Sequence, residues 1–220
     1  MIKRRRQSSS SSRIVPIDPL DPDLSIIRNA AALIRDGGLV AFPTQSLYGI
    51  GADIYQPDSV SRVFHAKRRP KDKPISVLVG SESRLSDLAS DVPEPAYRLM
   101  KRFWPGGLTI VFAAHPSVPS ALTGNTGKIG VRLPAHPVAV ALLDALDHPM
   151  TGTSANLSGH PGCSQISALA LEVMSEMAII LDAGPLIGGA GSTVVDVTKR
   201  PPKVLREGGV SYPEIRDCIK

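Results

Sequence analysis

Residues 21–51 read DPDLSIIRNAAALIRDGGLVAFPTQSLYGIG, and this stretch decides the fold class. Asp21 and Pro22 predict a helix start, because a capping carboxylate followed by proline in the first turn is typical of helix N-termini. The apolar residues that follow are spaced to share one helix face: Leu24, Ile27, Ala31 and Ile34. Gly37-Gly38 ends this helix, and residues 39–42 predict a buried strand directly after it. A helix that leads straight into a buried strand indicates an α/β domain.

The same alternation of helical and strand patterns continues to the end of the chain. Helices are predicted from residue 57 and over residues 96–103, 138–146 and 167–177, and strands over residues 75–79, 108–113, 129–133, 150–153, 178–181, 193–197 and 204–206. The last strands follow one another without helices, which favours a mixed sheet over a purely parallel one. A chain of 220 residues is long enough for one sizeable core. We therefore expect a single α/β domain over residues 13–220, with a twisted mixed β-sheet flanked by helices.

The composition is that of an ordinary globular protein, with 42% hydrophobic and 20% charged residues. The apolar runs are too short to span a bilayer, so no membrane association is expected. Cys163 and Cys218 stand in no disulfide or metal-ligand spacing, which favours a reducing compartment and a cytoplasmic location. A net charge of +5 indicates polyanionic ligands, either nucleotides or RNA.

Five of the 25 basic residues lie in an N-terminal segment, residues 1–12 with Arg13, that combines these cations with a serine run. Such a segment has too few apolar residues to offset the entropy lost on ordering, so residues 1–12 are predicted to be a disordered tail. A solvated tail that touches RNA is favoured over an organelle transit peptide, because the segment is short and not amphipathic.

Hydroxyls, amides and cations gather at a few places in the chain: residues 43–51, 67–74, 152–159, 191–196 and 205–209. Taken singly each is weak, since a loop, a serine-rich turn or a solvated helix end is the usual meaning of such a pattern. The basic run 67–74 is more informative, because Lys67 continues the apolar stripe of its helix and so points toward the sheet. Arg132 lies alone inside a strand pattern, a position that requires an anionic partner or an open face.

No nucleophilic triad, metal cluster or paired carboxylate is recognisable in the sequence, and the five histidines show no ligand spacing. Covalent and metalloenzyme mechanisms are therefore not expected. The pattern instead favours chemistry on phosphates, which needs positioning and charge neutralisation but little proton transfer.

Taken in order along the chain, these motifs resemble those of the YrdC family, the threonylcarbamoyl-AMP synthases. The resemblance runs from about residue 13 to residue 209 and rests on PTQSLYGIG at 43–51, KRRPKDKP at 67–74, VRLP at 131–134, SANLSG at 154–159, STVVD at 192–196 and Arg206. It implies a YrdC-like fold with a concave basic face. It also implies a nucleotidyltransferase that makes threonylcarbamoyl-AMP and pyrophosphate from L-threonine, bicarbonate or CO2 and ATP, for threonylcarbamoyladenosine modification of tRNA.

The resemblance also implies roles for individual residues. Thr44, Arg132 and Ser192 would contact threonine. The residues assigned to ATP and its phosphates are Lys67, Arg69, Lys73, Ser154, Asn156 and Arg206, with Lys67 and Arg69 as the catalytic pair. No protein metal site is expected, and Mg²⁺ would arrive with ATP. The activated product would pass to a tRNA threonylcarbamoyltransferase of the TsaD class, and contact with tRNA or other RNA is a further expectation.

The chain departs from the family pattern at three places. Gln45 and Ser46 replace the commoner acidic residue and threonine, and Leu78 stands where some longer relatives have a histidine that touches threonine. The chain ends soon after Arg206, so we expect the short, single-domain form without the extra C-terminal domain of those relatives.

Two other functions remain open from the residues. A basic sheet of this kind could bind tRNA or rRNA through phosphates without catalysing a reaction. The chain could also belong to the related YciO branch, whose activity is uncertain. The intact Ser154-Ala155-Asn156 segment favours the synthase over both.

Overall fold

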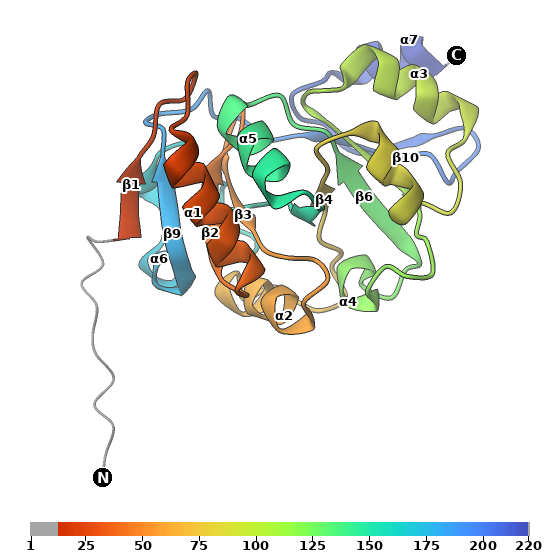
Figure 1. The fold of residues 1–220 in the computed structure, drawn as a ribbon. Helices are drawn as coiled ribbons and strands as arrows, with labels where there is room; N and C mark the ends of the chain where they lie inside the picture. The colour runs from red at the N-terminus through yellow and green to blue at the C-terminus, as the bar shows by residue number, and fades with distance from the viewer. Residues whose placement is uncertain (1–12, 220) are drawn as a thin grey trace.

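The computed structural model describes residues 13–219, and the predicted tail at residues 1–12 lies outside these described residues. A single α/β domain is confirmed, but its strands form two mixed sheets instead of the predicted one. The five-stranded sheet has the order β1-β9-β2-β3-β8, and the six-stranded sheet has the order β11-β10-β5-β6-β4-β7. Figure 1 shows the first sheet beneath α1 and α5 and the second sheet beside α3.

The five-stranded sheet is built from β1 (Ile14–Pro16), β9 (Met177–Asp182), β2 (Leu39–Pro43), β3 (Tyr48–Gly51) and β8 (Thr153–Ser154). The strands β1, β9 and β2 are parallel, whereas β3 is antiparallel to both β2 and β8. The antiparallel strand β3 follows β2 after a four-residue turn, so residues 39–51 form a hairpin, and residues 43–51 are its turn and second strand and not only a loop.

The six-stranded sheet is built from β11 (Lys203–Arg206), β10 (Thr193–Asp196), β5 (Leu108–Ala113), β6 (Lys128–Arg132), β4 (Val77–Leu78) and β7 (Met150–Thr151). Parallel and antiparallel pairs alternate across it. The predicted strand at residues 75–79 is thus reduced to Val77–Leu78, and the predicted strand at 150–153 is shared between the two sheets.

The division into two sheets has a local cause at Gly152. The segment 150–154 changes sheets at this residue, because Met150–Thr151 pairs with β4 while Thr153–Ser154 pairs with β3. A Cβ atom on Gly152 would lie 2.5 Å from the side chain of Leu78, so the backbone passes closer to β4 than any other residue type allows. The sequence pattern of two short strands does not reveal to which sheet each belongs.

Helices cover both sheets. The helices α1 (Leu24–Arg35) and α5 (Pro137–Leu146) pack against β2 and β9 and form one apolar cluster with them. A second, larger cluster joins the other side of that sheet to the six-stranded sheet. It includes residues of α2 (Pro57–Ala66), α3 (Glu94–Phe103), α6 (Leu171–Glu176), the four-residue α4 (Ser120–Thr123) and α7 (Tyr212–Ile219).

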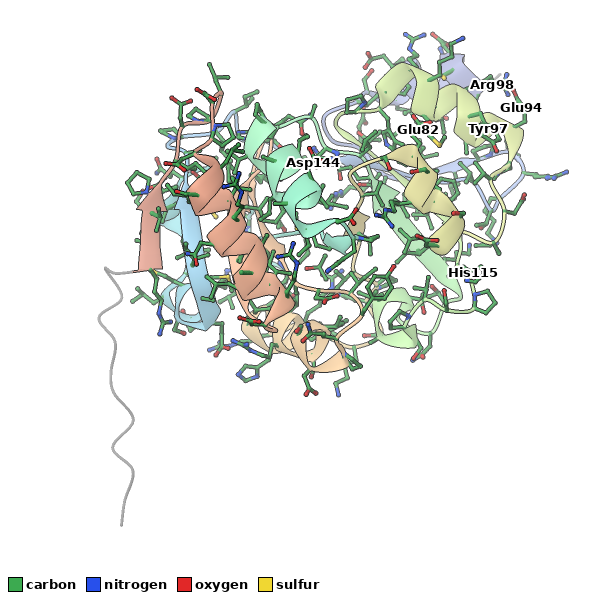
Figure 2. The ribbon with its side chains drawn as sticks, in the orientation of Figure 1. Glu82, Glu94, Tyr97, Arg98, His115 and Asp144 are labelled. Carbon is green, nitrogen blue, oxygen red and sulfur yellow. The ribbon has the colours of Figure 1, made fainter. Side chains whose placement is uncertain are left out.

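The helix α3 illustrates how the apolar stripe sets the packing. Its buried residues Ala96, Leu99 and Met100 face the core. Figure 2 shows Glu94, Tyr97 and Arg98 together on the other side of α3, where Arg98 and Glu94 form an exposed i,i+4 ion pair of 3.1 Å. Exposed pairs of this kind contribute little stability, so the buried stripe holds the helix in place.

The short 3₁₀ helices η2 (Glu82–Asp87) and η3 (Ile166–Ala168) complete the secondary structure, and η3 precedes α6 where one longer helix was predicted. No helix within residues 13–219 is long and apolar enough to cross a membrane.

The turn after β11 generates a stability prediction. A Cβ atom on Gly208 would lie 2.5 Å from the carbonyl oxygen of Gly191 and 2.6 Å from the carbonyl carbon of Ser192, so the backbone would have to move. We expect Gly208→Ala to lower the free energy of unfolding by about 1–3 kcal/mol, as overpacking does in general. Urea denaturation measures this change.

The neighbouring Gly209 supplies the control, because a Cβ atom there would come no closer than 3.6 Å to any atom. We expect Gly209→Ala to change the free energy of unfolding by less than about 0.5 kcal/mol. Equal destabilisation by the two substitutions would contradict this description of the turn.

Candidate functional site

A cavity of about 540 Å³ lies where the two sheets meet. Its wall includes Tyr48, Gly49 and Ser154 from the five-stranded sheet and Leu78 and Arg132 from the six-stranded sheet. A volume of this size is typical of pockets that hold a nucleotide or a drug-sized ligand. The junction of the sheets thus creates the site.

The cavity brings together eight of the nine residues that the sequence singled out, namely Thr44, Lys67, Arg69, Arg132, Ser154, Asn156, Ser192 and Arg206. The ninth, Lys73, is exposed and is not among the described residues that line the cavity. Its backbone carbonyl accepts a hydrogen bond of 3.2 Å from Arg69 Nε. In this structure Lys73 therefore contributes to the site through its backbone carbonyl, which bonds Arg69.

Lys67 caps the C-terminus of α2 and is buried, with only 1% of its surface exposed. This confirms the prediction that it points inward. Its Nζ donates to the carbonyl oxygens of Ser154 and Asn156, the latter at 2.9 Å, and to Asn156 Oδ1 at 3.3 Å. Burial, reinforced by the nearby Arg69 guanidinium, lowers the pKa of Lys67 to about 7.

Ser154 and Asn156 bind each other. The Ser154 hydroxyl donates to Asn156 Oδ1. The side-chain nitrogen Nδ2 of Asn156 donates to the carbonyl oxygens of Leu157, at 2.8 Å, and His160, at 2.6 Å. Both side chains thus shape the loop that follows β8.

Arg69 follows a tight turn at Arg68, whose φ of 47° is in the left-handed region. The Arg69 guanidinium donates from Nη2 to the carbonyl oxygen of Pro74 at 2.7 Å. Partial burial lowers the pKa of Arg69, and the positive charge of Arg206 acts in the same direction. Two arginines therefore face the same cavity close enough to repel each other.

Arg132 lies at the end of β6 with 7% of its surface exposed. Its Nε donates to the carbonyl oxygen of Gly106 at 2.7 Å, and its Nη2 donates to Gln45 Oε1 at 2.6 Å. Burial, together with Arg206, lowers the pKa of Arg132 to about 10, which still leaves it charged at neutral pH. The neutral amide of Gln45 orients this guanidinium without neutralising it, a contact that the sequence did not predict.

Ser192 and Arg206 also line the cavity and bond each other. Arg206 donates from Nε and Nη2 to the carbonyl oxygen of Ser192, at 3.1 and 2.7 Å, and from Nη2 to its hydroxyl at 3.2 Å. The Ser192 hydroxyl also bonds Thr109 Oγ1 at 2.8 Å. Thr44 is buried and donates from Oγ1 to the carbonyl oxygen of Leu47 at 2.6 Å.

Loop residues that sequence reasoning did not single out complete the cavity wall, namely Ser76, His160, Pro161, Gly162, Gly189 and Ala190. A Cβ atom on Gly162 would lie 2.6 Å from Cδ1 of Leu47, so the end of the Leu47 side chain would have to shift. The only sequence signal for these loops is their glycine content, which does not indicate where a loop folds.

The four cations of the cavity, Lys67, Arg69, Arg132 and Arg206, share one property. Each is oriented by backbone carbonyls or by neutral side chains, and within residues 13–219 none forms an ion pair with a carboxylate. The described residues that line the cavity include no Asp or Glu. Over the same residues, no group of three or more His, Cys, Asp or Glu side chains could hold a metal ion. The site is therefore built to accept an anion.

Comparison with known proteins gives a consistent match. The family model Sua5/YciO/YrdC, described as "Telomere recombination", matches residues 32–208. The threonylcarbamoyl-AMP synthase of Pyrococcus abyssi is 42% identical over 193 residues, which is 88% of this chain and 57% of that protein. The chain thus spans little more than half the length of this relative.

Two solved structures support the fold. The crystal structure of P. abyssi Sua5 complexed with L-threonine has a TM-score of 0.89 and 40% identity, over 94% of this chain and 60% of that one. The crystal structure of Escherichia coli YciO has a TM-score of 0.84 and 29% identity, over 92% of this chain and 98% of that one. This chain therefore shares its fold with both of these solved structures.

The buried ammonium of Lys67 generates a prediction for stability against pH. Its pKa is about 7 when folded, against an ordinary value of 10.5, so above pH 7 the unfolded chain holds a proton that the folded chain lacks. Unfolding then takes up protons, and the free energy of unfolding rises with pH in this window. Relative to Lys67→Met, the wild-type value should rise by about 1–2 kcal/mol from pH 7 to pH 8.5.

Urea denaturation of both proteins at several pH values measures this difference. The comparison stops at pH 8.5 because the nearby Cys163 also contributes to the pH dependence at higher pH. Burial holds the pKa of its thiol above the ordinary value of 9.0, so the folded and unfolded chains differ in the charge of Cys163 there. A difference that stays flat or falls with pH would show that the Lys67 ammonium keeps its charge throughout this range.

Proposed function

Because the chain belongs to the Sua5/YciO/YrdC family, we propose that it is an L-threonylcarbamoyladenylate synthase. The substrates are L-threonine, bicarbonate or CO2, and ATP, and the products are threonylcarbamoyl-AMP and pyrophosphate. The observation that carries the proposal is the set of four cations that lie in one cavity without a carboxylate partner among the described residues. Such a site fits a reaction that brings two anions together.

The reaction explains why the cavity needs no strong general base. The neutral threonine amine adds to CO2 and loses one proton, or condenses with bicarbonate and releases water, to form a carbamate. A carbamate oxygen then attacks the α-phosphorus of ATP, the bond to the bridging oxygen breaks, and pyrophosphate leaves. The carbamate is already anionic, so this step needs charge neutralisation and alignment and does not need proton removal.

The positions of the residues suggest a division of the cavity. Arg69 and Arg206 are assigned to the ATP phosphates, because both guanidiniums line the cavity and retain N–H donors beyond those that bond the backbone. Arg132 is assigned to the threonine carboxylate, which a guanidinium can bind through two N–H groups. Thr44 and Ser192 would bond the polar groups of threonine.

Lys67, Ser154 and Asn156 form the wall beside the nucleotide. Lys73, also assigned to ATP from the sequence, would reach it only by a side-chain movement, since it is exposed and outside the cavity wall. The described residues supply no carboxylate cluster for a metal, so we assign Mg²⁺ to the triphosphate with which it enters. Transfer of the threonylcarbamoyl group to tRNA would then require a TsaD-class transferase.

Two relatives bear on the choice of function. The P. abyssi relative is named a threonylcarbamoyl-AMP synthase, and a Sua5 structure contains L-threonine. YciO of E. coli matches more of its own length but at 31% identity, compared with 42% for the synthase. The higher identity supports the synthase, and the intact SANLSG motif at residues 154–159 agrees with it. An RNA-binding module without catalysis is the remaining alternative.

The assay that tests the proposal follows pyrophosphate release from ATP and Mg²⁺ by the purified chain. We expect release to require both threonine and bicarbonate. Arg69→Ala should lower the rate at least roughly 100-fold, the scale typical of removing a preorganised charge-stabilising group. Lys67→Ala should cause a loss of similar size.

Arg68→Ala is the matched control. Arg68 precedes Arg69 in the chain but is exposed, and within residues 13–219 its guanidinium forms a 3.5 Å surface ion pair with Glu172. Its removal should leave the rate within about twofold, because such pairs contribute little. Pyrophosphate release that ignores threonine or bicarbonate, or equal rates for the Arg69 variant and wild type, would refute the assignment.

A further inference from the structure

The loop from Ser154 to Ser158 is joined to the end of α2 by both the backbone and the side chain of a single residue. The Ser158 N–H donates to the carbonyl oxygen of Lys67 at 2.8 Å. In the opposite direction, Lys67 Nζ donates to two loop carbonyls and to Asn156 Oδ1. Lys67 and Ser154 are 87 residues apart in the sequence, so no local turn holds the two segments together.

The donors of Lys67 match these acceptors in number. A lysine ammonium has three N–H groups and no acceptor. The three oxygens contacted by Nζ belong to Ser154 and Asn156, and the side chain is buried at 1% exposure. With all three donors directed at the loop, none is left for a phosphate while this arrangement holds.

Hydrogen bonds of Asn156 extend the contact with Lys67 through the loop. Asn156 Oδ1 accepts from both Lys67 and Ser154, while Asn156 Nδ2 donates to the backbone of Leu157 and His160. Asn156 thus transmits the position of the ammonium to residues on either side of it. Ser154, Asn156, Ser158 and His160 all line the cavity, so this network sets the shape of one wall.

We propose that Lys67 is a positioning residue whose ammonium holds the 154–158 loop in the shape of the cavity wall, so that Lys67 acts on a bound nucleotide through this loop and not by direct contact with phosphate. This inference rests on the proposed function only for the identity of the ligand. The link between Lys67 and the loop stands on the contacts alone.

The electrostatic surroundings agree with an anchoring role. Arg69 is the charged group that acts most on the ammonium and repels it, and Cys163 lies near it from the segment after the loop. Arg206 faces the same cavity from β11. A phosphate bound by Arg69 and Arg206 would also favour the charged form of Lys67, since an anion nearby stabilises a cation. Ligand binding would therefore strengthen the anchor.

Hydrogen–deuterium exchange on the full chain without ligand tests the link between Lys67 and the loop. Lys67→Met keeps a side chain of similar length but removes all three donors, so the amides of residues 154–160 should exchange at least about tenfold faster than in wild type. Asn156→Ala cuts the same network from the loop side and should speed exchange in the same segment. Lys101→Met, at an exposed position of α3, is the control and should leave this segment unchanged.

A double-mutant cycle on ATP binding tests how Lys67 reaches the ligand. If Lys67 acts through Asn156, the variant with both substitutions should bind ATP no more weakly than the weaker of the two single variants. A direct phosphate contact predicts that the two fold-losses multiply. Multiplied losses, or loop exchange unaltered in both single variants, would overturn the proposal. Absence of ATP binding in the wild type would refute the proposed function and leave the exchange result standing.

Discussion

The structure depends on cations that are oriented by neutral acceptors. Lys67, Arg69, Arg132 and Arg206 each donate to backbone carbonyls, with the side chains of Asn156, Gln45 and Ser192 as additional acceptors. A carboxylate partner would orient an arginine equally well but would also cancel its charge. Carbonyl dipoles fix the geometry and leave the charge available to a ligand. Mutual repulsion and burial cost stability, and a bound anion relieves both.

The fold makes this arrangement possible because the backbone carbonyls that orient the cations lie where the two sheets meet. The close passage of Gly152 past Leu78 divides one extended segment between the sheets and places Ser154 opposite the end of α2. Neither sheet alone carries all four cations, since Arg132 and Arg206 belong to strands of the six-stranded sheet while Lys67 is held by the strand β8 of the other. The positions of the four cations therefore depend on the backbone path at Gly152.

Much of this could be predicted from the sequence, for identifiable reasons. Lys67 continues an apolar helix stripe, and that periodicity correctly predicted its burial. For Arg132, isolated in a strand, the sequence predicted an anionic partner or an open face, whereas its buried guanidinium lines the cavity and bonds the neutral acceptors Gly106 and Gln45. The two sheets could not be predicted, because strand partners are set by contacts between distant residues such as β3 with β8. The Gln45 contact and the exposed position of Lys73 were missed for a similar reason, since neither depends on local pattern.

The most direct test of the account is mass spectrometry of the nucleotide product formed from ATP, threonine and ¹³C-bicarbonate. We expect a threonylcarbamoyl-adenylate that is one mass unit heavier than the product made with unlabelled bicarbonate, together with pyrophosphate. An unlabelled adenylate, or hydrolysis of ATP without any threonine-containing nucleotide, would contradict the claim that these cations join a carbamate to the α-phosphate.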